Sequence, residues 1–350
     1  MKPCSRICLF ALMFVCFCLG GCADAANRPV TDMKKKMDVE VGAVQKASVL
    51  STDGQEVPLD VSVLLDELPT AGKELMLSDR SLRREDVRYT LILHRKVEAP
   101  LVLEVGADGS QFGGKTYGGS GAVSFYHWVR RLTGNALLRS EIHSMELSAG
   151  DMGRSLLLGD RDAEAIRKAI QGAQYLDATE AGKYPLYPHY QVKLQTANGL
   201  LTASVLTPTV ISLPFGKETH TFRVDGSLFS ALTRLIPPHE VGSDPFAGLF
   251  KASEISVLPI GKRSFSPVTV NVTKSIVEQS IAHQCIRLLK EGIHQSPPPR
   301  LPRQELYQIQ FRVDGKNRVV NMYDRYFVFE GKVYAYAGGT QALLTLFGKK

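Results

Sequence analysis

One pattern occurs three times in the chain, and it constrains the fold more than any other feature of the sequence. A tyrosine, a polar residue and an apolar residue begin at Tyr89, Tyr190 and Tyr307, and a Gly-Lys dipeptide follows each triplet. The tyrosine and the lysine are 26, 27 and 25 residues apart in chain order. Self-similarity at a nearly fixed period indicates repeated structural units. Three unrelated antiparallel meanders with Gly-Lys turns are the alternative interpretation.

The C-terminal copy shows the structure of the unit most clearly. Tyr307–Val313 alternates apolar and polar residues, Asp314-Gly315 is typical of a tight hairpin, and residues 318–322 return. Residues 326–329 and 333–337 then flank a second turn, and a helix ends the copy near Leu346. Period-two alternation between such turns predicts four antiparallel strands. The copy therefore reads as a four-stranded meander with a closing helix.

The segments between the copies predict a strand and a helix before each meander. In the first unit a short helix is expected at residues 59–68 and a polar loop at residues 70–85. In the third unit Ser275 and Glu278 form a capping box. The helix after this box has an expected buried stripe consisting of Val277, Ile281, Cys285, Leu288 and Leu289.

The predicted fold class is α+β, with tandem related units, each an antiparallel meander sheet with one or two helices packed on it. The expected boundaries are residues 44–135, 136–240 and 241–350. About 100 residues per unit is an ordinary domain size.

The N-terminus carries a targeting signal. Lys2 and Arg6 precede an apolar run at residues 7–19, which ends in Leu19-Gly20-Gly21-Cys22. The run is too short for a permanent membrane-spanning helix. The last four residues resemble the lipobox of bacterial lipoproteins. This resemblance covers residues 1–22 only; an ordinary secretory signal and an uncleaved anchor helix are the alternatives.

The resemblance implies that residues 1–21 are a removable signal peptide and that Cys22 is the acylated first residue, carrying palmitate-type chains. Two or more acyl chains give stable membrane attachment. Residues 22–43 lack an apolar period and are expected to be a flexible tether. The expected location is the cell membrane or the outer membrane, on the extracytoplasmic side. Ala23 is not the aspartate that retains such lipoproteins at the inner membrane, which favours the outer membrane in a cell that has two.

Composition excludes one class of partner. The net charge is +7, and losing Lys2 and Arg6 with the signal leaves +5. The basic residues are scattered along the chain instead of forming one stripe, so we expect no nucleic-acid partner. The expected partners are the membrane, through the lipid on Cys22, and a protein or polymer of the cell envelope.

Residues 109–116 match the pattern GxxxxGK[ST] of a phosphate-binding loop. That chemistry needs the Gly-Lys-Thr to open a helix directly. Gly118, Gly119 and Gly121 oppose an immediate helix. A hairpin turn at Lys115, shared with the other two Gly-Lys positions, is the prediction, and no cofactor is expected.

No sequence motif marks a catalytic site. The eight histidines form no HExxH or Cys/His metal spacing, and no GxSxG elbow occurs. His239-Glu240 is the best exposed pair, with a plain loop as its alternative. Cys285, the only cysteine after Cys22, is expected to be a buried hydrophobe.

One aromatic cluster is a candidate binding surface for a sugar or a peptide. It consists of Tyr184, Tyr187, His189 and Tyr190, with prolines at positions 185 and 188. Packing at the edge of a core is the alternative for these rings.

The sequence leaves three classes of function open. The first is a non-catalytic, lipid-anchored surface for binding, inhibition or scaffolding, because tandem units usually act by presenting surface. The second is a cell-envelope hydrolase whose catalytic residues are dispersed in the sequence. A structural stabiliser of the envelope is a third class.

Overall fold

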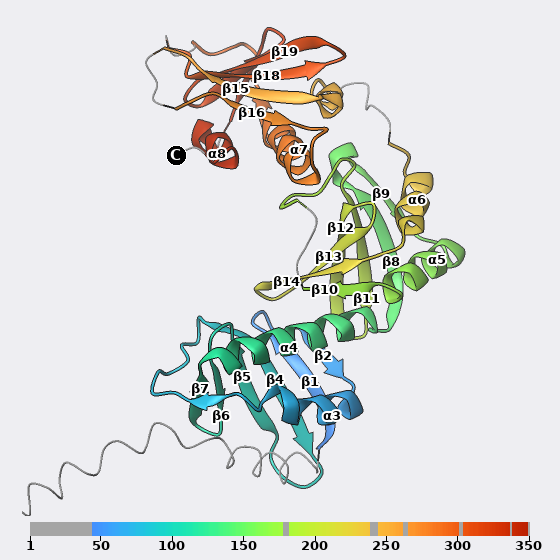
Figure 1. Cartoon of the computed structure of the whole chain (residues 1–350). Coiled ribbons are helices and arrows are strands. Elements are labelled where there is room, and N and C mark those ends of the chain that lie inside the picture. Colours follow the sequence, from blue (N-terminus) through green and yellow to red (C-terminus); the bar gives the residue numbers. More distant parts are fainter. Residues whose placement is uncertain are drawn as a thin grey trace, which may run out of the picture. The chain divides into compact units, whose positions relative to one another are not determined.

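The computed structural model describes residues 44–177, 182–238, 244–261, 265–300, 304–336 and 338–348 (Figure 1). Within these residues the chain forms three antiparallel sheets of seven strands each, one after another, and six α-helices. The α+β fold class and the tandem related units are therefore confirmed. We call the three sheets with their helices the first, second and third modules.

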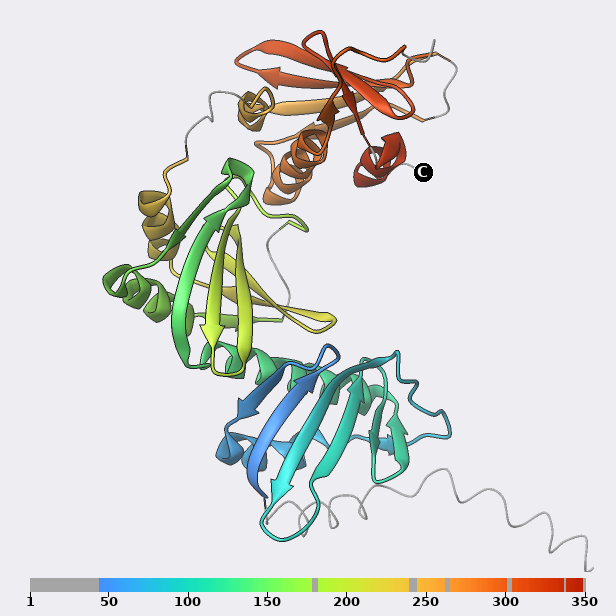
Figure 2. The same cartoon turned by 180° about the vertical axis from the view of Figure 1, so that it is seen from behind.

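The first module contains seven strands and two helices. Its elements are β1 (Val44–Ser51), β2 (Glu56–Leu59), α3 (Val61–Ala71), β3 (Met76–Leu77), β4 (Val87–Arg95), β5 (Leu101–Gly106), β6 (Ser110–Phe112), β7 (Lys115–Gly118) and α4 (Ser120–Leu138). Helices α3 and α4 lie on one face of this sheet, and its strands stand in front of α4 in the reverse view (Figure 2). Alternate residues of β4 are buried accordingly, from Val87 to Leu93.

The second module follows the same plan and adds a short 3-10 helix. Its elements are β8 (Ile142–Ala149), η1 (Gly150–Met152), β9 (Arg154–Leu157), α5 (Asp160–Gln171), β10 (Gln174–Leu176), β11 (Tyr190–Thr196), β12 (Gly199–Thr207), β13 (Val210–Phe215), β14 (Glu218–Arg223) and α6 (Gly226–Leu235).

The third module begins with a 3-10 helix and ends near the C-terminus. Its elements are η2 (Ala247–Lys251), β15 (Glu254–Pro259), β16 (Val268–Asn271), α7 (Ile276–Lys290), β17 (Ile293–His294), β18 (Tyr307–Val313), β19 (Lys316–Met322), β20 (Tyr326–Phe329), β21 (Lys332–Ala335) and α8 (Gly339–Leu346).

The three sheets have one topology. Each module runs hairpin, helix, short strand, four-stranded meander and closing helix, and its strands are ordered second, first, fourth, fifth, sixth, seventh, third. The predicted unit, which consisted of a strand, a helix and a four-stranded meander with a closing helix, was thus incomplete. It omitted the hairpin partner as a regular part of the unit, and it omitted the short strand that pairs with the end of the meander. The expected loop at residues 70–85 likewise contains the end of α3 and all of β3.

The repeated tyrosines occupy similar, buried positions in the three meanders. Tyr89, Tyr190 and Tyr307 lie at or near the start of the first meander strand, and all three are fully buried. A buried phenol needs a hydrogen-bond partner. The hydroxyl of Tyr190 donates to the carbonyl of Ile236, after the closing helix, at 2.7 Å. In the second module this contact joins the start of the meander to its end.

The repeated glycines form turns. Gly114, Gly216 and Gly331 have φ angles of +73°, +61° and +73°, which glycine adopts without strain. Each lies in the hairpin before the last meander strand. Lys115 and Thr116 therefore lie on the antiparallel strand β7 and not at the start of a helix. This geometry agrees with a turn and not with a phosphate-binding loop.

Side-chain caps fix three helix starts. Asp60 accepts the backbone N–H of Ser62 at 3.0 Å, and Asp225 does the same for α6. Ser275 accepts the N–H of Glu278 at 3.1 Å, as the capping box predicts. The Glu278 carboxylate accepts from Asn271 N instead, at 2.7 Å, so the helix start is tied to the end of β16.

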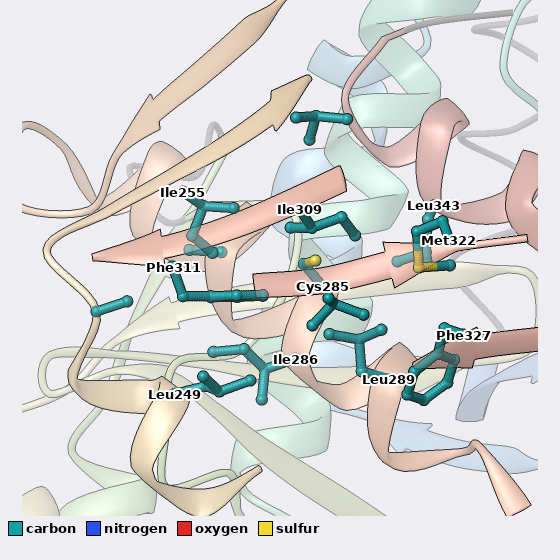
Figure 3. Close-up of a cluster of buried hydrophobic side chains, with 14 of the residues drawn as sticks. Leu249, Ile255, Cys285, Ile286, Leu289, Ile309, Phe311, Met322, Phe327 and Leu343 are labelled. Atoms are coloured by element: carbon teal, nitrogen blue, oxygen red, sulfur yellow. The ribbon is translucent and has the colours of Figure 1, made fainter. Parts of the chain in front are cut away.

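The core of the third module lies between α7, α8 and the inner face of its sheet. Figure 3 shows Cys285, Ile286 and Leu289 of α7 against Ile309 and Phe327 of the strands. The expected stripe on α7 was wrong in part, because Val277 is 51% exposed. Ile281 and Leu288 are only partly buried, while Ser280, Ala282 and His283 are buried. The helix is covered on a second side, where Ser280 and His283 face the second module.

The described chain divides into two compact units. Apart from residues 216–218, the break falls between Leu137 and Leu138, and the second and third modules belong to one unit. Helix α4 thus crosses the expected boundary at residue 135, and the expected boundary at residue 240 lies outside the described residues. No described helix combines the length and the apolar character that a membrane span requires.

Candidate functional site

The four residues of the predicted aromatic cluster have different environments. Tyr190 is fully buried, so its ring presents no surface to a ligand. The Tyr187 ring stacks on Phe250 of η2, with centroids 4.0 Å apart and planes 17° apart. Tyr184 is half-buried and lies 5.5 Å from the Lys183 ammonium group. His189 is half-buried and joins a polar network. The four side chains therefore have different environments, and the Tyr184 ring lies beside the ammonium group of the exposed Lys183.

The second and third modules meet at a polar junction, which consists of Asp151, Tyr187, His189, His283 and Arg287. The Arg287 guanidinium donates from Nε and Nη2 to the two Asp151 carboxylate oxygens, at 2.9 and 3.0 Å. Asp151 also accepts the backbone N–H of His189 at 2.9 Å. The Asp151 side chain is 7% exposed and that of Arg287 is 13% exposed. A bidentate pair at this burial fixes the relative orientation of the two side chains, because both carboxylate oxygens accept from the planar guanidinium.

Arg287 also donates hydrogen bonds to two backbone carbonyl groups. Its Nη1 donates to the carbonyl of Pro185 at 2.7 Å, and Nη2 donates to that of Leu186 at 3.0 Å. The backbone N–H of Tyr187 donates to Nδ1 of His283 at 2.8 Å. These three residue pairs are 96 to 102 positions apart in the sequence, and Asp151 and Arg287 are 136 apart, so no spacing rule indicates them. Asp151 and Arg287 were therefore not predicted from the sequence.

Both junction histidines are held neutral. Burial is the largest cause that lowers the pKa of His189 and of His283, and the Arg287 charge lowers both further. The opposing charge of Asp151 does not compensate, and each pKa is about 4. Burial alone would raise the pKa of Asp151, but the hydrogen bonds and charge of Arg287 lower it below its usual value. A neutral His283 can accept the Tyr187 N–H, which is a structural use of the imidazole.

The other residues considered for reactive chemistry are Cys285, Cys22 and the pair His239 and Glu240. Cys285 is fully buried, as expected, and burial raises the pKa of its thiol. A thiol in this setting is a poor nucleophile. Cys22 and the pair His239 and Glu240 lie outside the described residues. Over the ranges that the structure describes, no three His, Cys, Asp or Glu side chains are grouped for a metal ion.

A second surface recurs in the modules, at the sheet edge formed by the short strand. The backbone N–H of Ser78 donates to Thr116 O at 2.9 Å, and that of Gln295 donates to Val333 O at 2.9 Å. Leu77 pairs with Tyr117 and His294 pairs with Tyr334, so the two edges have the same register relative to the Gly-Lys turn. We call these positions the short-strand edges of the first and third modules.

Both edges expose apolar side chains. Met76 and Leu77 are 54% and 62% exposed, and Ile293 is 68% exposed. Exposed apolar residues on an edge strand are a common docking surface for another strand. The edges thus combine accessible backbone groups with side chains that favour contact.

The edge of the first module lies beside a polar cavity of about 700 Å³. The loop after β3 and the strand β7 line it. Arg83 of this loop is paired with Glu85 and Asp86, at 2.9 and 2.7 Å. Among the residues that the structure describes, Asp79, Arg80 and Asp108 line the cavity without an ion-pair partner. These groups can hydrogen-bond a polyhydroxylated or zwitterionic ligand.

Two cavities flank the edge of the third module. One, of about 400 Å³, is lined by Phe246, Lys290, His294, Lys332 and Tyr334, among others. The other, of about 500 Å³, is lined by Ile293, Asp324, Arg325, Tyr326, Ala335, Tyr336 and Gly338. Both lie at strand β17, so this edge offers space for side chains next to its backbone.

No family model, curated protein or solved structure matches this chain.

Proposed function

We propose that the chain is a lipid-anchored extracytoplasmic protein that acts without catalysis, as a binding, inhibitory or scaffolding surface at the cell envelope. One observation carries the proposal: a single topology is repeated three times, and the same sheet edge in two modules has exposed apolar residues beside cavities. Repeated units with an accessible edge favour recognition of a partner. The partner is a protein or polymer of the envelope.

The contacts of the junction residues favour a structural role for these residues over a catalytic one. His283 accepts a hydrogen bond from the backbone, and Arg287 binds a carboxylate and two carbonyl groups of the same chain. Groups engaged in this way stabilise the arrangement of the second and third modules. Their hydrogen-bond partners belong to the same chain.

The anchor follows from the lipobox resemblance and is tested separately. Cells grown with a radiolabelled or clickable fatty acid should label the wild-type protein and should not label the Cys22→Ala variant. The matched control is Cys18→Ala, which removes a cysteine of the signal peptide and should keep the label. Label on Cys22→Ala would contradict the anchor.

The binding role is tested by cross-linking in intact cells, followed by purification of the tagged full chain. Reproducible recovery of one protein or envelope polymer is expected. Recovery of none would count against the proposal. Turnover of a purified envelope polymer by the protein would instead support a dispersed hydrolase site.

A further inference from the structure

The backbone of β17 has one residue whose polar groups face away from its own sheet. Successive residues of a strand direct their N–H and C=O groups to opposite sides. Gln295 N–H points to β21, where it donates to Val333 O at 2.9 Å. His294, one residue earlier, therefore directs its N–H and C=O to the free side of the edge. A neighbouring strand could bond to both groups.

The strand residues that line the two cavities of this edge belong to opposite faces of the sheet. His294 pairs with Tyr334, two residues after Lys332, so these three side chains share the face of the smaller cavity. Ile293 pairs with Ala335, which in turn pairs with Tyr326, and these three line the larger one. Side chains of a strand alternate between faces every residue. A strand added at β17 would thus place successive side chains at the two cavities in turn.

The cavities differ in charge and polarity. In the smaller one, Lys290 is paired with Asp244 at 2.6 Å. Lys332 lines the same cavity and has no ion-pair partner among the residues described. Two lysines against one aspartate leave one positive charge there. The larger cavity has one acid and one base, Asp324 and Arg325, around apolar and aromatic groups.

We infer that the short-strand edge of the third module binds an extended peptide segment in which acidic and apolar side chains alternate. The segment adds as an eighth strand beside β17, bonds to the backbone of His294, and places an acidic side chain at Lys332 and an apolar one at Ile293. This inference rests on the proposed binding function and names the ligand class of the third module. The first module has Leu77 at the position of His294 and a different cavity, so its ligand differs.

The test uses the full-length mature chain and a fluorescent capped hexapeptide of alternating glutamate and valine. Two control peptides test the acidic charge and the alternation separately. In the first, lysine replaces glutamate. In the second, the same residues are arranged as a glutamate block followed by a valine block. Fluorescence anisotropy should give a dissociation constant for the alternating acidic peptide at least about 10-fold lower than for either control, because only that peptide satisfies both cavities.

Paired variants of the protein locate the site. His294→Pro removes the outward N–H while keeping the sheet bond of Gln295, because proline is tolerated at such edge positions. It should weaken binding about 10-fold or more, whereas His294→Ala, which keeps the N–H, should change it less than about 3-fold. Lys332→Gln should weaken binding about 5-fold, and Lys115→Gln, at the matching position of the first module, should leave it unchanged.

Several outcomes would overturn the inference. They are equal affinity for the three peptides, full binding by His294→Pro, or equal effects of Lys115→Gln and Lys332→Gln. If His294→Pro does not fold, as judged by circular dichroism, the lysine pair decides. Capture of one envelope partner equally by wild type and Lys332→Gln would retain the proposed function and reject this edge as its site.

Discussion

Acidification from pH 7 to pH 5 should destabilise the junction between the second and third modules. The half-buried His189 and the buried His283 lie there as neutral imidazoles, and each has a pKa of about 4. In the unfolded chain a histidine has a pKa of about 6.5. Between pH 6.5 and pH 4 the unfolded state therefore binds more protons than the folded state, and the free energy of unfolding falls as the pH falls.

The size of the effect follows from the shift. One pKa unit corresponds to about 1.4 kcal/mol, and pH 5 lies about 1.5 units below the unfolded value. Each histidine should thus cost about 2 kcal/mol of stability at pH 5, and the two together about 4 kcal/mol. The lowered pKa of Asp151 affects the free energy of unfolding in a lower pH range, because its stabilising contribution is lost only below the ordinary carboxyl pKa of about 3.9.

The His283→Gln variant isolates one of the two contributions. Glutamine does not titrate, and its amide oxygen can accept the Tyr187 N–H in place of Nδ1. Urea unfolding followed by circular dichroism at pH 7 and pH 5 should show a loss of about 4 kcal/mol in wild type and about 2 kcal/mol in the variant. Trp128, the only tryptophan, lies in the other compact unit and provides an internal reference by fluorescence.

An identical loss of stability in wild type and His283→Gln would refute the reasoning. It would mean that His283 is not buried in the form that the hydrogen bond to Tyr187 requires. A change in the Trp128 transition between the two proteins would show that the effect is not confined to the junction.

Three further predictions concern stability and reactivity. Gly331 has a φ of +73°, so Gly331→Ala should lower the free energy of unfolding by about 1–2 kcal/mol in thermal unfolding. Gly226→Ala, at an open position without a left-handed φ, should cost less. Equal costs for the two variants would contradict the turn. Arg287→Ala leaves the buried Asp151 carboxylate without its guanidinium and should cost about 3–5 kcal/mol in urea unfolding, more than Arg287→Lys; a neutral Arg287→Ala would disprove the pair. Cys285 should react with iodoacetamide only after unfolding, as mass spectrometry would show, and labelling of the folded protein would contradict its burial.

The meanders were predictable because local signals enclose each strand. Asp314 and Glu330 have φ angles of +48° and +49°, and each is followed by a glycine with a positive φ. Such pairs form hairpins by their own conformational preferences. The strands between them show alternation over four to seven residues, so the meander, its turns and its closing helix followed from the residues.

The short strands could not be predicted from the sequence. β3 and β17 have two residues each, and two residues show no period. They are strands only because β7 and β21 supply the partner backbone. The short-strand edges, which we consider the binding surface, therefore depend on pairing that no local pattern encodes.

The junction was unpredictable for a similar reason. Asp151 and Arg287 lie 136 positions apart, and neither belongs to a motif. Helix α7 has apolar residues around much of its circumference, so its period did not reveal which side contacts the second module. Val277 was placed on the buried side for this reason but is 51% exposed, whereas the polar residues Ser280 and His283 are buried on the side that faces the second module.

Site-specific photo-crosslinking at the edge of the third module tests the central claim most directly. A photoreactive amino acid replaces Ile293, which is 68% exposed, and in a parallel strain it replaces Leu200 on β12, which is 50% exposed. Irradiation of intact cells should give one defined adduct from position 293 and none from position 200. No adduct from position 293, or the same adducts from both positions, would contradict the account.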